Sequence, residues 1–329
     1  MTGAAPRSPV PLTVIGGFLG SGKTTLLNRV LAGDSGIRFA VLVNDFGDLA
    51  IDGDLVTEHG GDTITFANGC VCCTLGDNLL ITLDQLLARA DPPEQILVEA
   101  SGVADPIAIA DIGELHPRLA RDMVIVVVDA ENVAERAGDP RLADTVDRQI
   151  AAADLLLLNK CDLADNTAKA ALRDWLQTKV PATILETAYG DMPLSLLFAG
   201  GTAERRQGTA HYHDHGAAFR AVTVPLPDPV DIDRLRQILG RLSSDILRVK
   251  GFVASTGDGN HRTEVQVTGR RVTINDWPTP PGTTPPEPAL VFIGLPTMPT
   301  EEDLRAALIP LKGRSLKSPS APPQCTFYR

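Results

Sequence analysis

The sequence predicts an α/β protein made of a doubly wound domain with a mainly parallel sheet, followed by a smaller α+β domain. Three observations lead to this prediction. Unbroken Val/Ile/Leu runs alternate with helical stretches over residues 10–198, as in parallel strands buried on both faces. A glycine-rich segment lies between the first apolar run and the first helical stretch. After residue 216 the pattern changes to strands with alternating polar and apolar residues.

In the first domain, apolar runs predict the strands and apolar residues at helical spacing predict the helices. The strands are Leu12–Ile15, Phe39–Val43, Ile96–Val98, Val124–Val128, Leu155–Leu158 and Thr183–Leu185. The helices are Thr24–Leu31, Leu79–Ala90, Ala143–Ala152 and Ala168–Lys179. Strands and helices therefore alternate along the chain, which is the order of a doubly wound fold.

The second domain is predicted over residues 217–312, after a linker at 199–216 and before a Ser/Pro-rich tail at 313–329 that we expect to be mobile. Its predicted strands are Arg220–Pro225, Ile246–Val253, Glu264–Thr268, Arg271–Ile274 and Leu290–Ile293. Its predicted helices are Ile232–Leu242 and Glu301–Leu308. This succession favours a sheet that is mostly antiparallel.

The overall composition limits the function classes. With 41 acidic against 30 basic residues the formal net charge is −11, which argues against nucleic acid or an anionic membrane as a partner. No apolar run approaches the roughly 20 residues of a membrane span, and residues 1–9 lack the apolar centre of a secretory signal. We therefore expect a cytoplasmic protein, in which clustered cysteines serve metal binding or redox chemistry.

Gly17-Phe-Leu-Gly-Ser-Gly-Lys-Thr24 matches the phosphate-binding loop G-x-x-x-x-G-K-[ST] completely, between a strand and a helix of a P-loop NTPase domain. Backbone N–H groups of such a loop surround the β-phosphate, and the helix N-terminus adds a favourable dipole. Lys23 should reach the β- and γ-phosphate oxygens, and the Thr24 hydroxyl should bind Mg²⁺. The predicted nucleotide ligands here are Gly17, Gly20, Ser21, Gly22, Lys23, Thr24 and Thr25.

Asn159-Lys160-Cys161-Asp162 follows an apolar strand and matches N-K-x-D, the guanine-reading motif of GTPases. The Asp162 carboxylate can accept hydrogen bonds from N1–H and the exocyclic amine of guanine, whereas adenine would leave that carboxylate unpaired. Asn159 can address the other edge of the base, and the stem of Lys160 can pack on its face. The motif therefore favours GTP over ATP.

Ile96-Leu-Val-Glu99-Ala-Ser-Gly102 places E-x-x-G where most GTPases have D-x-x-G. We expect the Gly102 N–H to contact the γ-phosphate, and Glu99 to lie near Mg²⁺ or to orient the attacking water. Lys23, Glu99 and Gly102 are thus the predicted catalytic residues. Asp129 is a second candidate for the metal shell, and capping of the next turn is its alternative role. No obvious water-positioning Gln follows Gly102, which predicts slow intrinsic hydrolysis.

Three of the five cysteines lie within four residues, at Cys70, Cys72 and Cys73. Two of these thiolates, with ligands from elsewhere, can bind Zn²⁺ or Co²⁺. Asp45 or Asp48, in the segment where GTPases carry their first switch, is the predicted oxygen ligand. A structural zinc site and a thiol redox switch are the alternative roles of this cluster.

His211, His213 and His215 alternate in the linker. They can bind a metal weakly or pass it on, and the alternative is a polar linker without a metal role.

Taken together, these motifs resemble the CobW-like metal-homeostasis GTPases, relatives of the urease and hydrogenase nickel-insertion GTPases. The second domain resembles the family's C-terminal domain through L-R-V-K-G-F at 247–252, Trp277 and V-F-I-G at 291–294. At the position of Asp45 the family usually has Glu. The matching segments of the first domain are G-G-F-L-G-S-G-K-T-T at 16–25, V-N-D-F-G at 43–47, N-G-C-V-C-C-T-L at 68–75, E-A-S-G-V-A-D-P at 99–106 and N-K-C-D at 159–162.

The resemblance implies GTP hydrolysis coupled to delivery of zinc, cobalt or another transition metal to a client protein. It also implies a metal site built around the cysteine motif. The expected cofactors are GTP, Mg²⁺ and Zn²⁺ or Co²⁺, with zinc first because of its availability. The expected partners are a metal-dependent client protein and a second copy in a nucleotide- or metal-dependent dimer.

Two other function classes fit the same motifs. One is a metal-storage or metal-sensing protein that uses the nucleotide as a structural element. The other is a P-loop small-molecule kinase, although neither an acceptor site nor a base for phosphate transfer is visible in the sequence.

Overall fold

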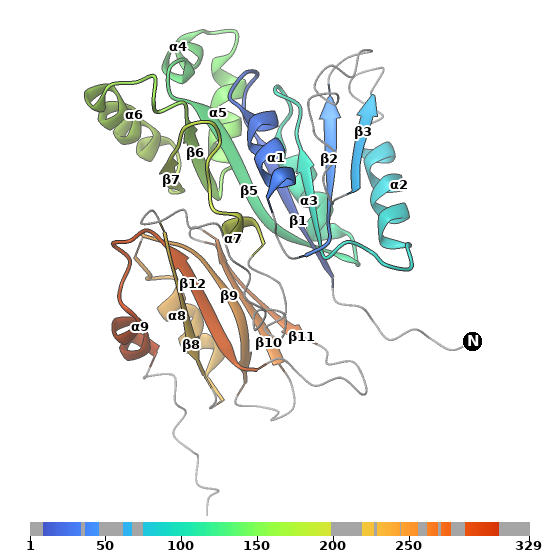
Figure 1. The fold of residues 1–329 in the computed structure, drawn as a ribbon, viewed down its shortest axis with the longest axis vertical. Helices are drawn as coiled ribbons and strands as arrows, with labels where there is room; N and C mark the ends of the chain where they lie inside the picture. Colours follow the sequence, from blue (N-terminus) through green and yellow to red (C-terminus); the bar gives the residue numbers. More distant parts are fainter. Residues whose placement is uncertain are drawn as a thin grey trace, which may run out of the picture.

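Two sheets of different kinds build the molecule, and Figure 1 shows them one above the other. The computed structural model describes residues 9–33, 37–45, 62–67, 75–198, 219–226, 229–243, 245–255, 262–268, 271–277 and 287–308. Of these, residues 44–45, 62–67 and 75–78 are described by their backbone alone. None of the helices within these ranges is long and apolar enough to cross a membrane.

The first sheet has seven strands among the described residues, in the order β3-β2-β4-β1-β5-β6-β7, and its strand pairs are parallel. Parallel pairing brings the carboxyl ends of β1, β4, β5 and β6 to one edge of the sheet, where the phosphate-binding and guanine-reading motifs begin. The strands are β1 Val10–Gly16, β2 Phe39–Asp45, β3 Asp62–Ala67, β4 Gln95–Glu99, β5 Leu119–Asp129, β6 Leu155–Asn159 and β7 Thr183–Glu186.

Helices cover both faces of this sheet. The core on one face joins side chains of β1, β4, β5 and β6 to those of α2, α3, α5 and α6, and the core on the other face joins the sheet to α1 and α7. Because both faces are buried, most residues of the central strands are Val, Ile or Leu. The helices are α1 Lys23–Ala32, α2 Leu75–Leu87, α3 Pro106–Leu115, α4 Val133–Gly138, α5 Ala143–Ala151, α6 Asn166–Lys179 and α7 Leu194–Leu197.

The second sheet is antiparallel and has the order β11-β10-β9-β12-β8 among the described residues. Its strands are β8 Arg220–Pro225, β9 Ile246–Ala254, β10 Arg262–Thr268, β11 Arg271–Trp277 and β12 Ala289–Gly294. The helices α8, Ile232–Leu239, and α9, Glu301–Leu308, pack on the same face through Leu235, Leu239 and Leu304. On the opposite side, Leu247 and Ile293 join the core beneath α1 and α7 of the first sheet.

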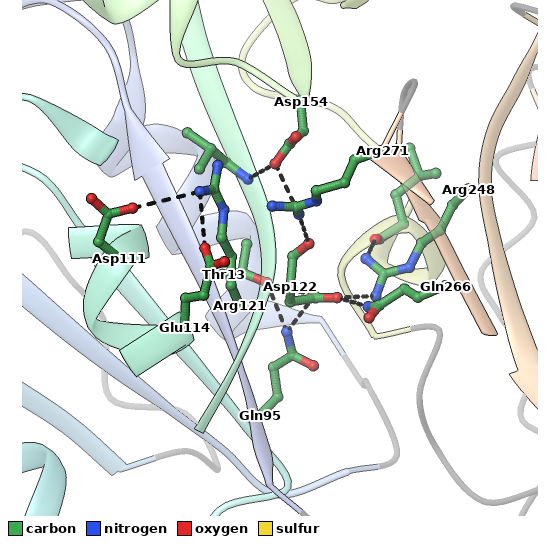
Figure 2. A network of polar contacts seen from close by, with 12 residues as sticks. Thr13, Gln95, Asp111, Glu114, Arg121, Asp122, Asp154, Arg248, Gln266 and Arg271 are labelled. Atoms are coloured by element: carbon green, nitrogen blue, oxygen red, sulfur yellow. Dashed lines mark hydrogen bonds and ion pairs between the residues drawn. The ribbon is translucent and has the colours of Figure 1, made fainter. Parts of the chain in front are cut away.

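A buried carboxylate joins the two sheets (Figure 2). Asp122 on β5 is fully buried, and its Oδ2 accepts hydrogen bonds from Thr13 Oγ1 at 2.8 Å and Gln95 Nε2 at 3.0 Å. Its Oδ1 accepts from the second sheet, from Arg248 Nη2 at 2.7 Å and from Gln266 Nε2. Burial raises the pKa of Asp122, but the charges of Arg248 and Lys250 and these hydrogen bonds outweigh it, so the pKa lies below its ordinary value.

Two arginines of the second sheet complete this junction. Arg248, 1 % exposed, also donates from Nη1 to the carbonyl of Leu196 in α7 at 2.6 Å. Arg271 donates to the backbone carbonyl of Asp122 and forms an ion pair with Asp154 Oδ2 at 3.1 Å. The junction therefore lies at the start of β6 and in the first half of β5, away from the strand ends that carry the nucleotide motifs.

The predicted fold class is confirmed: a mainly parallel sheet of the P-loop type is followed by an antiparallel α+β unit. The predicted strands recur with extended ends, whereas β3, α3, α4 and α7 were not predicted. Helix α2 begins at Leu75 and ends at Leu87, earlier than the predicted 79–90, and α8 ends at Leu239, before the predicted Leu242.

Candidate nucleotide and metal site

The phosphate-binding loop lies between β1 and α1, and its glycines have backbone angles that other residues rarely adopt. Gly17, Gly20 and Gly22 have φ values of +132°, +73° and +104°. A Cβ on Gly17 would lie 2.2 Å from the carbonyl oxygen of Val127, and a Cβ on Gly22 would lie 2.2 Å from Asn159 Nδ2. The loop is therefore packed tightly against the ends of β5 and β6, and only glycine fits at these two positions.

The side chains of the loop fit a phosphate. Lys23 is buried, and its Nζ donates to the carbonyl oxygens of Gly17 at 2.9 Å and Phe18 at 3.5 Å, so the ammonium lies over the loop. The hydroxyl of Ser21 is buried without a hydrogen-bond partner among the described residues. A buried hydroxyl of this kind suits an oxygen-rich ligand held in the loop. Thr24 is half-buried and Thr25 is exposed on the first turn of α1.

Asn159 connects the guanine-reading motif to the phosphate-binding loop. This buried side chain donates from Nδ2 to the carbonyl of Ser21 at 2.9 Å, and its Oδ1 accepts from the N–H of Gly190 at 2.9 Å. Asn159 thus fixes the relative positions of two loops, a role that the sequence did not predict. Asp162 is exposed at the surface of the same motif, and Cys161 N donates to the carbonyl of Thr187 at 3.0 Å.

Lys160 extends across the ends of β5 and β6. Its backbone is left-handed, with φ at +63°, and its Nζ forms an ion pair with Asp129 Oδ2 at 2.8 Å. Asp129 is buried and also accepts from the N–H of Glu131 at 3.0 Å and from Asn132 Nδ2 at 2.9 Å. Burial raises the pKa of Asp129, but hydrogen bonds from Lys160 and Asn132 outweigh it and keep the pKa below its ordinary value. The capping role considered for Asp129 is thus present in the structure.

The E-x-x-G segment begins at the end of β4. Glu99 is buried and pairs in register with Ile15, the residue before the end of β1. A Cβ on Gly102 would lie 2.9 Å from the backbone nitrogen of Leu19, so this segment lies directly against the phosphate-binding loop. Gln149 of α5 holds it there, because its Nε2 donates to the carbonyls of Gly102 at 3.1 Å and Ala104 at 3.0 Å.

The predicted transition-metal ligands are described only in part. Cys70, Cys72 and Cys73 lie outside the described residues, as do Asp48 and the linker residues His211, His213 and His215. Asp45 is the last residue of β2 and pairs in register with Ala67, the last residue of β3. Since Ala67 is followed after two residues by Cys70, the chain leads from this strand pair into the cysteine motif. Within the described ranges, no group of three or more His, Cys, Asp or Glu residues could hold a metal ion.

Two family profiles match the chain. The profile of the CobW/HypB/UreG nucleotide-binding domain matches residues 11–185, and that of the cobalamin synthesis protein CobW C-terminal domain matches residues 219–309. The chain belongs to the CobW/HypB/UreG family. The resemblance inferred from the motifs is therefore confirmed.

Relatives within the CobW/HypB/UreG family extend along most of the chain. The zinc chaperone CobW of Pseudomonas aeruginosa is 36 % identical over 80 % of this chain and 81 % of its own. The zinc chaperone YjiA of Escherichia coli is 32 % identical over 93 % of this chain and 99 % of its own. The zinc-regulated GTPase metalloprotein activator 1 of Schizosaccharomyces pombe is 35 % identical over 55 % of this chain and 46 % of its own.

Three residues of the site were missed by sequence reasoning. Gln149 and Arg136 act through contacts with loops far away in the sequence, so no local pattern marks them. Tyr189 lies next to Gly190, is 67 % exposed and has a left-handed φ of +54°. Tyr189 lies within the segment T-A-Y-G-D, which has no recognisable motif, so sequence reasoning could not have found it.

Proposed function

We propose that this protein is a GTP-hydrolysing metallochaperone that delivers a transition metal, zinc first and cobalt next, to a client protein. The observation that supports its GTP-dependent part is the hydrogen bond from Asn159 of N-K-x-D to Ser21 of the phosphate-binding loop at 2.9 Å. The names of the relatives, zinc chaperone and zinc-regulated GTPase activator, support the same function.

The proposed roles of the nucleotide ligands follow from their positions. Lys23 Nζ donates to the Gly17 carbonyl, and rotation of the lysine side chain would bring it to the oxygens of a phosphate bound in the loop. Asp162 reads the base, and Gly102 contacts the γ-phosphate from the segment that lies against Leu19. Glu99, at the end of β4, orients the attacking water. Thr24 would hold Mg²⁺, which neutralises charge on the β- and γ-phosphates when it is bound.

The metal is carried as cargo by Cys70, Cys72 and Cys73, with Asp45 as an oxygen ligand. Two strands link this site to the nucleotide. Asp45 ends the strand next to β4, since Val43 pairs in register with Glu99, and β3 leads into the cysteines. Movement of the E-x-x-G segment with the γ-phosphate therefore reaches the strand that carries Asp45. We propose that GTP completes the metal site and that hydrolysis loosens it.

The test is metal affinity in two nucleotide states. The full chain is loaded with a non-hydrolysable GTP analogue or with GDP and titrated with Co²⁺, followed by absorption, and then with competing Zn²⁺. We expect the analogue to raise metal affinity about 5- to 150-fold, the range of a coupling of 1–3 kcal/mol. Equal affinities in the two states would contradict nucleotide-coupled delivery.

Matched variants identify the ligands. Cys72→Ala and Cys73→Ala should abolish the cobalt absorption while GTP binding survives. Cys161→Ala is the control, since that thiol is half-buried and donates to the carbonyl of Leu158. Turnover of GTP without any acceptor molecule excludes the kinase alternative. Lys23→Ala should remove GTP binding, and a storage protein would keep its metal function in that variant.

A further inference from the structure

Asp129 lies at the end of β5 and contacts Lys160 of the base-reading motif. It is the last residue of that strand and pairs in register with Asn159, the first residue of N-K-x-D. Its side chain is 1 % exposed, and its Oδ2 faces two cations, Lys160 Nζ at 2.8 Å and Arg136 Nη2 at 4.0 Å. One buried carboxylate thus faces two cations, Lys160 just after β6 and Arg136 on α4.

The first cation supports the base. In N-K-x-D the aliphatic stem of Lys160 is the part expected to lie against guanine, so its position depends on where the ammonium is anchored. Asp129 supplies that anchor, because its Oδ2 accepts from Lys160 Nζ at 2.8 Å. Because a lysine stem has four rotatable bonds, fixing its end removes conformational freedom that nucleotide binding would otherwise have to remove.

The second cation supports the phosphate-binding loop. Arg136 of α4 donates from Nη1 to the carbonyl of Leu19 at 3.1 Å, and its guanidinium lies over the ring of Phe18 at 5.2 Å from the centroid. Phe18 and Leu19 are the second and third residues of the loop. Arg136 is therefore bound to the loop backbone, to a loop ring and, through charge, to the carboxylate that holds Lys160.

We propose that Asp129 is a positioning residue that sets guanine-nucleotide affinity by holding Lys160 under the base and Arg136 against the phosphate-binding loop. This role goes beyond the capping of the next turn, which uses Glu131 and Asn132. It rests on the proposed function, because it requires that the two loops bind a guanine nucleotide. Asp129 itself does not contact the nucleotide in this proposal.

The test is a double-mutant cycle read by the affinity for mant-GDP, a fluorescent GDP. Asp129→Asn should weaken binding about tenfold, the size expected from loss of one charge-assisted hydrogen bond. In a Lys160→Met background the same change should cost about threefold or less, because the cation that it positions is gone. Equal losses in both backgrounds would indicate a merely structural role and overturn the assignment.

Asp139→Asn is the matched control. This carboxylate lies at the C-terminal end of α4 and pairs with Arg141 instead of Lys160 or Arg136. It should leave affinity unchanged. Failure of the unmodified chain to bind mant-GDP would refute the proposed function. Normal binding by the unmodified chain with equal binding by a folded Asp129→Asn variant would refute only the role of Asp129.

A second variant tests the arrangement if Asp129→Asn does not fold. Arg136 lies at the surface with 25 % of its side chain exposed, so Arg136→Met should fold. We expect mant-GDP affinity to fall about fivefold, with Arg141→Met, a neighbouring arginine that is 86 % exposed, as an unaffected control. Unchanged affinity in Arg136→Met would overturn the proposal.

Discussion

Single polar side chains hold the loops of the candidate site in place. Gln149 is an example: it is 2 % exposed, and one amide group donates to the carbonyls of Gly102 and Ala104. A buried amide that uses both of its N–H groups in this way fixes a loop more firmly than a single contact would. The position of the proposed γ-phosphate sensor therefore depends on a residue 47 positions later in the chain.

Replacing this amide should slow GTP hydrolysis. In Gln149→Leu the two carbonyls lose their donor, and one buried and one partly buried hydrogen bond of about 1 kcal/mol each are removed. We expect the hydrolysis rate to fall about tenfold, with mant-GDP affinity changed less than threefold because GDP has no γ-phosphate. Gln177→Leu, an exposed position on α6, is the control. A normal hydrolysis rate in a folded Gln149→Leu variant would contradict the role of this contact.

At the residue scale, sequence reasoning predicted residues that would contact a nucleotide and missed the residues that position the loops around them. Lys23 and Asn159 belong to motifs whose spacing is fixed by phosphate and guanine chemistry. Gln149, Arg136 and the anchoring role of Asp129 depend on contacts between segments that only folding brings together. Their residue types are common in helices and turns, so nothing local distinguishes them.

Among the elements, the unit of β1, loop and α1 is the most constrained. Its loop fits between the ends of β5 and β6 with no space for a Cβ at Gly17 or Gly22. The elements that the sequence missed had weaker signals. Strand β3 alternates polar and apolar residues as T-I-T-F, so a search for unbroken apolar runs did not find it. Helix α3 was marked only by its start, with Asp105 as N-cap and Pro106 in the first turn.

A methyl group on Gly17 should disrupt this unit. The left-handed φ of +132° strains any other residue, and the added Cβ would lie 2.2 Å from Val127 O. We expect Gly17→Ala to lower the free energy of unfolding by about 3 kcal/mol or more and to abolish GTP binding. Gly138→Ala should be nearly neutral, since nothing lies within 4 Å of its Cβ position. Urea unfolding of both variants measures the difference; equal stability would contradict it.

Across the whole molecule, the two sheets are joined by polar groups as well as by apolar packing. Four side chains donate to the two oxygens of Asp122, two from each sheet. Sequence reasoning noted Arg248 only as part of the family motif L-R-V-K-G-F. Its partner, Asp122, lies 126 residues earlier, so the contact could not be predicted. In the same motif, Phe252 packs edge-on against Trp277 with ring centroids 4.9 Å apart.

Asp122→Asn should weaken this junction. An amide has one acceptor oxygen, and its NH₂ group would face the donors Thr13 and Gln95 or those of the second sheet. We expect a loss of about 3–5 kcal/mol at pH 7, the range for breaking a buried ion pair. Asp276→Asn, an exposed change in β11, should have little effect. Thermal unfolding measures both, and a fully stable Asp122→Asn variant would contradict the prediction.

Acid should weaken the unmodified junction in the same way. The pKa of Asp122 is lower in the folded chain than its unfolded value of about 3.9, so its stabilising contribution is complete above that pH. The contribution is lost as pH falls below about 4 toward the folded pKa. The acid dependence of stability should therefore be flatter in Asp122→Asn than in the unmodified chain.

The distance in sequence between Asp122 and Arg248 also has a consequence for synthesis on the ribosome. Strand β5 is complete long before its cationic partner, because 126 positions separate the two residues. At 5–20 residues per second, the delay is about 6–25 s. Throughout that interval Asp122 has its donors Thr13 and Gln95 from the first sheet but lacks the cation and the amide that bind its Oδ1. The buried charge of Asp122 is therefore neutralised only after β9 has emerged.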